Sequence, residues 1–261
     1  MSRLRVGTPS GVGDVMWCMA KLKALAAGRR VTLCIQSSQY DRAIDLANMV
    51  DFVAGAEFMD FDPGVARETG YAENVGGLNM VMWPNAFIDR GERIETWLPH
   101  LAMDLNFELR TPDMGPPRTV VYASSVAINE TWMQGKGAAY WVRLIADLAQ
   151  DFGRITLVGA AWDAPFRDQL QGMDVEDLVG KTTLPQLAGI IRNARIVVGV
   201  ICGITIIANH LRTPCIAVWP DWKFPPSFPY AWVAKDAPYV AVPVSALATV
   251  NLRAVASALA R

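Results

Sequence analysis

One carboxylate follows directly on a glycine turn near the start of the sequence, in the run Gly11-Val12-Gly13-Asp14. Residues 4–8 are strand-like, and the apolar positions of 14–27 repeat with a helical period, so the run is expected at a strand-to-helix turn. Glycines there let a ligand approach the backbone, and the free N–H groups of a helix start favour an anion. Asp14 therefore has two interpretations. Its negative charge stabilises the helix by interacting with the positive end of the helix dipole, or it removes a proton from an acceptor hydroxyl at the end of the first strand.

A second strand-turn-helix pattern runs from Val197 to Thr205 and includes Cys202, Gly203 and Ile204. The backbone amides of Gly203, Ile204 and Thr205 would lie at a helix N-terminus, where they could hold a diphosphate. Ordinary contact between a strand and a helix explains the same pattern, because neither Ile201 nor Cys202 offers a strong hydrogen bond. Both interpretations stay open on the sequence.

Three further groups of residues could contact a ligand. The turn 124–137 contains Ser124, Ser125 and Lys136, and Lys136 either neutralises a phosphate or is a solvated surface lysine. Gly180-Lys181-Thr182 is similar to the end of a phosphate loop, but Val175 stands where the Walker motif needs a glycine. Thr183 and Gln186 instead predict a capping box that starts a helix.

Several tryptophans of the second half of the chain could be core residues or a platform for a sugar or a base. They are Trp132, Trp141, Trp219, Trp222 and Trp232. We expect an acceptor or sugar platform formed by Trp17 of the first predicted helix and by Asp221 and Trp222 of the Trp- and Pro-rich loop 219–232.

The elements that must position these residues follow a repeated βα pattern. The pattern is interrupted at 110–118, where three prolines and a glycine indicate a linker. We therefore expect one domain over 1–112 and another over 113–261, with a last helix over about 245–260 that could return to the first domain. Residues 90–106 are expected to form a helix interrupted at Pro99.

Composition excludes several classes of protein. Hydrophobic residues make up 52% of the 261 residues and charged residues 19%, which argues against disorder. The two longest runs without a charged residue, 196–211 and 237–252, have 16 residues each, so no membrane span is predicted. With no secretory signal in residues 1–14, a cytoplasmic protein is expected.

Cysteines and net charge argue against a metal centre and against strong binding to nucleic acid. Four cysteines without a CxxC spacing, and two histidines, predict reduced core thiols and no metal site. Basic and acidic residues nearly balance, 11 − 14 = −3 up to Pro112 and 13 − 11 = +2 after it, which is not the charge of a nucleic-acid-binding protein. Residues 7–13 also lack a GxGxxG fingerprint in register, which disfavours a hydride-transferring enzyme.

Three segments resemble the heptosyltransferase-like glycosyltransferases of family 9. The opening run 11–15 with the helix 20–25 is similar to the family's glycine-turn motif, and 177–187 is similar to its D-L-x-G-K-T segment. The blocks 194–203 and 208–214 resemble its A-R-x-V-V-G and H-L-A-x-A-x-G-T-P stretch. The resemblance implies a compact GT-B protein, with two Rossmann-like βα domains whose parallel sheets face a cleft.

The resemblance also implies a function: inverting, metal-independent transfer of a sugar from a nucleotide-diphosphate sugar to a hydroxyl of a glycan or another acceptor. Asp14 would be the catalytic base, and no cofactor is implied. The donor would be held by residues of both halves: Gly11, Gly13, Ser124, Ser125, Lys136, Lys181, Cys202, Gly203, Ile204 and Thr205.

The chain departs from the family pattern at the donor loop, where Val200, Ile201 and Cys202 replace Asn-Asp-Ser and Ile206 replaces a histidine. Two alternatives therefore stay open. One is a phage-type transferase that acts on a modified DNA base, and the other is a relative that binds a ligand but transfers nothing.

Overall fold

The computed structural model describes residues 3–36, 42–123, 136–170 and 172–260. The chain forms two compact units. The first consists of Met1–Thr111 together with Phe224–Trp232, and the second of Pro112–Lys223 together with Val233–Arg261. The segment that the first unit takes from the far part of the sequence is thus 224–232, rather than the C-terminal helix.

The first unit contains a five-stranded sheet in the order β3-β2-β1-β5-β4. Four strands run parallel, and β4 is antiparallel to β5. The strands are β1 (Arg3–Thr8), β2 (Arg30–Gln36), β3 (Val53–Met59), β4 (Tyr71–Glu73) and β5 (Met80–Met82). Since the chain leaves β1 toward β2 but returns to β5 on the other side, the strand order reverses between β1 and β5. Ligands bind at the carboxyl ends of strands at such a switch point.

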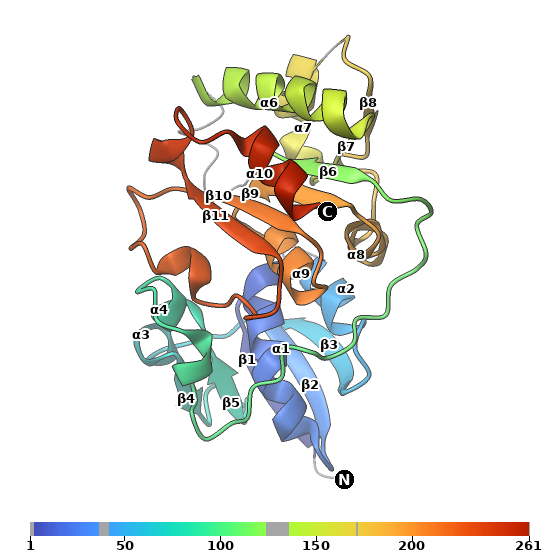
Figure 1. The fold of residues 1–261 in the computed structure, drawn as a ribbon. Coiled ribbons are helices and arrows are strands. Elements are labelled where there is room, and N and C mark those ends of the chain that lie inside the picture. The colour runs from blue at the N-terminus through green and yellow to red at the C-terminus, as the bar shows by residue number, and fades with distance from the viewer. Residues whose placement is uncertain (1–2, 37–41, 124–135, 171, 261) are drawn as a thin grey trace. The chain divides into compact units, whose positions relative to one another are not determined.

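Helices α1 (Val12–Ala26) and α2 (Arg42–Ala47) contact each other and the strands β1 to β3. Helix α1 lies against the sheet in Figure 1, with the side chains of Val15, Cys18, Met19 and Leu22 fully buried. Apolar residues around Phe61 and Leu78 form a separate cluster with Cys34 of β2. The short helices α3 (Ala66–Thr69) and α4 (Asn85–Ile88) complete this unit.

The second unit contains a parallel six-stranded sheet in the order β11-β10-β9-β6-β7-β8. Its strands are β6 (Thr119–Tyr122), β7 (Ile155–Leu157), β8 (Val175–Asp177), β9 (Ile196–Val200), β10 (Cys215–Trp219) and β11 (Tyr239–Pro243). Counted along the chain and read from β8, this is the 3-2-1-4-5-6 order of the Rossmann fold, whose switch point lies between β6 and β9. Nearly every residue of β6, β9 and β10 is buried, as expected for a sheet covered on both faces.

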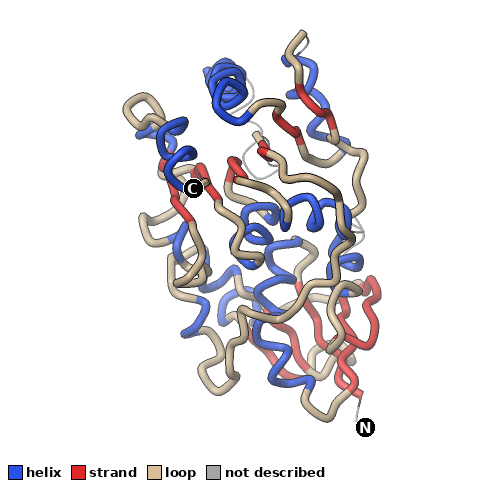
Figure 2. Tube along the Cα trace, turned by 45° about the vertical axis from the view of Figure 1, so that its right-hand side comes forward, coloured by secondary structure: helices blue, strands red, loops and turns tan. Residues whose placement is uncertain are grey.

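Helices cover both faces of this sheet. In Figures 1 and 2, α6 (Lys136–Phe152) and α10 (Leu252–Leu259) lie on one side, and α8 (Leu184–Arg192) and α9 (Gly203–His210) on the other. The short α7 (Ala164–Arg167) follows β7. Arg253 of α10 pairs with Asp151 of α6, which fixes the C-terminal helix within the second unit.

The expected helix over 90–106 is wrong. Only a 3₁₀ turn, Ile94–Thr96, forms there, and the rest of the segment is irregular. The alternation of charged and apolar residues in this segment is similar to that of an amphipathic helix. Ile94 and Trp97 are nevertheless buried by contacts with residues far away in the sequence. Pro99 also removes a backbone donor that a helix would need.

Two general properties follow from the elements. Within the described ranges, no helix combines the length and the apolar character needed to cross a bilayer. The four cysteines are free thiols; Cys18, Cys34 and Cys215 are buried and Cys202 is half-buried.

The predicted capping box at the start of α8 is confirmed: the Thr183 Oγ1 accepts from the backbone N–H of Gln186, and the Gln186 Oε1 accepts from that of Thr183 at 2.9 Å. Replacing Thr183 by alanine should therefore lower the free energy of unfolding by about 1 kcal/mol, measured by urea denaturation. Thr183→Ser keeps the hydroxyl and should unfold near the wild-type midpoint. An alanine variant as stable as the wild type would show that the box contributes nothing.

Candidate active site

Asp14 lies at the switch point of the first sheet, in the first turn of α1. Its carboxylate packs over Gly11, where any Cβ would overlap it. The Asn85 side chain hydrogen-bonds the same carboxylate from the start of α4, which follows the neighbouring strand β5. One helical turn after Asn85, the exposed Asp89 ends α4 and acts on Asp14 through its charge. The switch point thus brings to Asp14 an amide and a second carboxylate that follow it in the sequence by 71 and 75 residues.

The Asp14 carboxyl has a pKa raised from 3.8 to about 7. Burial is the larger cause, since it disfavours the charged form, and the negative charge of Asp89 adds to it. The hydrogen bond from Asn85 acts in the opposite direction and is outweighed. A carboxyl with a pKa near neutrality is suited to general-base catalysis, because it binds and releases a proton at physiological pH.

Trp17, one turn after Asp14 on α1, is buried against Trp232, with ring centroids 5.2 Å apart. Trp232 belongs to the segment 224–232, which the first unit takes from the second half of the chain. Phe228 of this segment contacts the Trp232 ring edge-on at 5.4 Å and stacks on Phe224 at 3.8 Å. Trp17 is therefore part of an aromatic cluster rather than an open platform.

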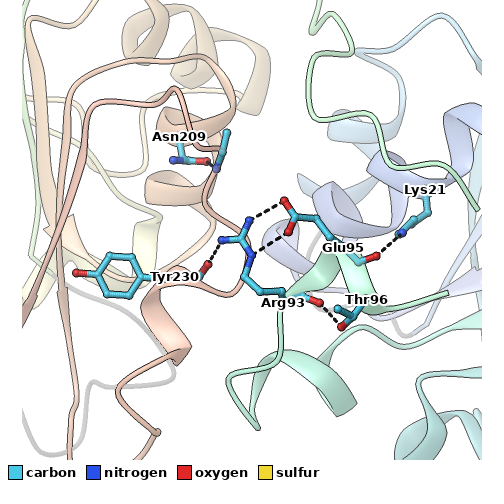
Figure 3. Close-up of polar contacts among 7 residues, drawn as sticks. Lys21, Arg93, Glu95, Thr96, Asn209 and Tyr230 are labelled. Carbon is cyan, nitrogen blue, oxygen red and sulfur yellow. Dashed lines mark hydrogen bonds and ion pairs between the residues drawn. The ribbon is translucent and has the colours of Figure 1, made fainter. Parts of the chain in front are cut away.

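Hydrogen bonds hold the segment that carries Trp232 (Figure 3). The Arg93 guanidinium pairs with Glu95 at 2.7 Å and donates to the carbonyl of Tyr230 at 2.6 Å. The N–H of Ile94 donates to the carbonyl of Ala231. These contacts connect the irregular segment after α4 to residues 224–232.

Lys21, two turns after Asp14 on α1, is almost completely buried. Its ammonium donates to the carbonyls of Glu95, Leu98 and Leu101 at 3.1–3.5 Å, and the contact with Glu95 is drawn in Figure 3. Burial lowers the pKa of Lys21, and the charge of Glu95 opposes that shift. The lysine fixes the segment 95–101 against α1 and also explains why that segment is irregular: three of its carbonyls accept from a side chain.

The predicted donor loop of the second unit lies at the carboxyl end of β9, beside β6 at the switch point. Cys202 precedes α9 with an extended backbone, and its sulfur interacts with the backbone N–H groups of Ile204 and Thr205. Burial nevertheless raises the pKa of the Cys202 thiol to about 12, so the thiol is neutral. The fully buried Thr205 hydroxyl is also used within the turn, since it accepts from the Cys202 N–H and donates to the Cys202 carbonyl.

Lys181 is held by Asp177: its ammonium lies 2.6 Å from the carboxylate and 2.9 Å from the backbone carbonyl. The turn between them passes beside the end of β7, where the N–H of Gly180 donates to the carbonyl of Gly159. At the same edge, the buried Asp163 accepts from the N–H of Ala160 at 2.7 Å, and its charge acts on Cys202.

The remaining predicted residues are not brought into these clusters. Trp222 is 58% exposed, and the neighbouring Asp221 carboxylate hydrogen-bonds the hydroxyl and the N–H of Ser245. Gly13 lies within the first turn of α1. Ser124 and Ser125 lie outside the described residues, and Lys136 begins α6, with its side chain outside the description.

Sequence reasoning missed Asn85, Asp89 and Asp163. A signal for the first two was present, because Pro84-Asn85 directly follows the apolar run 78–82. Recognising that run as the parallel neighbour of the first strand would have placed Asn85 beside Asp14. Asp163 stands three residues after Ala160, the spacing of a helix-start carboxylate.

The arrangement of the chain as two α/β units, each built on a mainly parallel sheet, is that of the GT-B glycosyltransferases. Structural comparison finds the ADP-heptose LPS heptosyltransferase II of E. coli, with a TM-score of 0.68 and 15% identity over 100% of this chain and 98% of that one. The E. coli heptosyltransferase WaaC, solved with ADP, is similar at a TM-score of 0.63 and 16% identity, over 98% of both chains. A family 9 glycosyltransferase of Veillonella parvula gives 0.62 and 12%, over 94% and 86%.

Residues 111–230 match the sequence profile of glycosyltransferase family 9 (heptosyltransferase). The resemblance inferred from the motifs is thereby confirmed for this range, which matches a glycosyltransferase family 9 (heptosyltransferase) domain, and the similar solved structures share the fold of the chain. No protein of curated function matches the chain by sequence.

The raised pKa of Asp14 predicts how stability depends on pH. Between the ordinary pKa of 3.8 and about 7, the folded chain binds more protons than the unfolded chain, so stability falls as pH rises through this window. Asp14→Asn removes that loss, and we expect the variant to be more stable than the wild type at pH 8, by up to about 4 kcal/mol, and nearly equal at pH 4. Urea denaturation at both pH values measures the difference.

Asp51→Asn, which removes an exposed carboxylate of the same unit, controls for the loss of one charge. If the free energies of unfolding of Asp14→Asn and the wild type differ by the same amount at pH 4 and at pH 8, Asp14 is not a buried carboxylate with a raised pKa.

Proposed function

We propose that the protein is an inverting glycosyltransferase that moves a sugar from a nucleotide-diphosphate sugar to an acceptor hydroxyl, with Asp14 as the general base. The observation that carries the proposal is the Asp14 carboxyl itself, half-buried at the switch point of the first sheet with a pKa of about 7. A purely helix-stabilising carboxylate would be solvated and acidic, whereas this one is held where it is costly to ionise.

The proposed reaction needs one proton acceptor and one stabilised leaving group. Ionised Asp14 takes the proton of the acceptor hydroxyl, and the oxygen attacks the anomeric carbon on the face opposite the nucleotide. The bond from that carbon to the diphosphate oxygen breaks, its electron pair stays on the diphosphate, and the configuration inverts. Because the hydrogen bond from Asn85 favours the ionised form, Asn85 also orients the base.

The second unit is proposed to bind the donor at the switch point between β6 and β9. The Rossmann strand order supports this assignment, as does the family 9 profile over 111–230. At this point the first-turn amides of α9 present the positive end of a helix dipole to a diphosphate. The E. coli heptosyltransferase WaaC has been solved with ADP and with ADP-2-deoxy-2-fluoro heptose, which supports a nucleotide-diphosphate donor here.

We further propose that the leaving diphosphate is stabilised without a metal ion. In the described ranges, no three His, Cys, Asp or Glu side chains gather in a group able to hold one. The α9 amides would supply the positive potential instead.

Asp14→Asn should lower the rate of sugar transfer by at least about 10²-fold, because the amide cannot accept the proton of the acceptor hydroxyl. Donor binding, which is proposed for the second unit, should be unchanged. In the wild type, kcat/KM should rise with pH and level off above about 7, where Asp14 is ionised. Mass spectrometry of the product after incubation with ADP-sugars and an acceptor panel gives the rate, and thermal shift gives donor binding.

Asp51→Asn serves again as the control and should transfer at the wild-type rate. Turnover by Asp14→Asn close to the wild type would remove Asp14 as the base. A wild-type protein that binds a donor but neither transfers nor hydrolyses it would instead indicate a relative that only binds its ligand.

Gly203→Pro should weaken binding of ADP about tenfold, because it removes the first amide of α9 while proline suits the first position of a helix. Cys202 has an extended backbone (φ −169°, ψ −174°), outside the α region that a following proline disfavours. Isothermal titration with ADP measures the affinity, and thermal melting checks the fold.

Gly203→Ala adds bulk but keeps the amide, so its affinity should remain near the wild-type value. Equal loss of affinity in both variants would mean that the amide does not hold the diphosphate.

A further inference from the structure

The segment 224–232, here called the strap, is part of the first unit, although the residues on both sides of it belong to the second. Its last residue, Trp232, is buried and contacts Trp17 of α1, with ring centroids 5.2 Å apart. One residue earlier, the carbonyl of Ala231 accepts from the N–H of Ile94 at 2.8 Å. These two contacts hold the C-terminal end of the strap on the first unit.

The middle of the strap lies against the irregular segment that follows α4. The Arg93 guanidinium donates to the carbonyl of Tyr230 at 2.6 Å (Figure 3). Gly91, with a φ of +71°, approaches the strap so closely that a Cβ on it would overlap the Ser227 side chain. The strap is thus held by individual side-chain and backbone contacts and not by a place in the sheet. Structure of this kind can open locally while the rest of the protein stays folded.

Immediately after the strap, the chain is held by the second unit. Ala234 is buried, and its N–H donates to the Oδ1 of Asn209 at 3.1 Å (Figure 3). Asn209 is itself buried and belongs to α9, six residues after Gly203. Only Val233 therefore separates the contact of Trp232 with the first unit from the contact of the next residue with the second.

This short connection limits what the strap can do when it opens. Two residues of extended chain span at most about 7 Å, so an opened Trp232 stays near Ala234 as long as Asn209 holds it. Without the Asn209 contact, more of the chain before Asp236, whose carboxylate pairs with Arg212 at 2.9 Å, can move with the strap. The opened strap then has more conformational entropy, which favours opening.

We propose that the strap couples the two units through the covalent chain: the contact of α9 with Ala234 keeps the strap on α1, and the docked strap keeps Ala234 on α9. Such coupling is reciprocal, because each contact changes the equilibrium constant of the other by the same factor. Under the proposed function, α9 binds the donor and α1 carries Asp14. The strap would then give donor binding an effect on the helix of the base.

Hydrogen exchange of backbone amides, followed by NMR, measures the coupling without a ligand. Asn209→Leu approximately keeps the size of the side chain but removes the acceptor of Ala234. The N–H of Ile94, which belongs to the other unit, should then exchange about fivefold faster, the factor expected for freeing about one residue. Thr183→Ala, which weakens the second unit at the capping box of α8, is the control and should leave the exchange of Ile94 unchanged.

The reciprocal experiment changes the first unit. Arg93→Ala removes the donor to Tyr230 and loosens the strap, so the N–H of Ala234 in the second unit should exchange at least about twofold faster. Arg90→Ala is the matched control, because Arg90 is an exposed arginine of the same segment and pairs with Glu92. This variant should leave the exchange of Ala234 at the wild-type rate.

A longer connection separates the coupling from the loss of a contact. Three glycines inserted between Trp232 and Val233 keep the residues of both contacts, but the effect of Asn209→Leu on the exchange of Ile94 should disappear. The same insertion at Gly115, an exposed turn residue of the linker, should leave that effect intact.

An Ile94 amide indifferent to Asn209→Leu, in a variant whose Ala234 amide exchanges faster, would overturn the proposal. An equal effect of Thr183→Ala would overturn it too, since the response would then be a general loosening of the second unit. If Asn209→Leu does not fold, Arg93→Ala decides, and an indifferent Ala234 amide overturns the coupling. Titration with ADP tests the proposed donor site separately, so failure of the proposed function and failure of the strap are distinguishable.

Discussion

The strand order of two parallel sheets is the constraint on which both candidate clusters depend. In each unit the strands that follow the first one are added on one side of it, and later strands are added on its other side. At this switch point, the connections that leave the carboxyl ends of the two neighbouring strands run in opposite directions and leave a crevice between them. Between β1 and β5 this leaves Asp14 facing Asn85, and between β6 and β9 it leaves the turn of Cys202. Residues far apart in sequence meet there because the sheet, and not local sequence, sets their distance.

At Asp14 three local influences compete, and burial prevails. The first turn of a helix and a hydrogen bond from Asn85 both favour the ionised carboxylate. Burial and the charge of Asp89 oppose them and raise the pKa to about 7. A Cβ at Gly11 would overlap the Asp14 carboxylate where it lies, so the glycine turn that identifies the motif in the sequence also leaves room for the proposed base.

Local patterns were predictable from the sequence, and long-range contacts were not. The glycine turn before Asp14, the capping box of Thr183 and the break near Pro112 all depend on neighbours within a few residues. Trp232 contacts Trp17, which lies 215 positions earlier in the sequence, and no local sequence pattern predicts this contact. The error at 90–106 has the same origin, since the carbonyls that a helix would have used accept from the distant Lys21.

The apolar donor loop is the feature for which sequence and structure lead to different conclusions. By sequence, Val200, Ile201 and Cys202 remove the side chains expected to bind a diphosphate, which weakens the donor site. In the structure, the sulfur of Cys202 interacts with the first-turn amides of α9, and its thiol is neutral. A thiol is a weak acceptor, so these amides keep most of their positive potential and an anion can replace the sulfur at little cost. The substitution therefore removes side-chain ligands from the loop but keeps the backbone amides on which the proposed donor site depends.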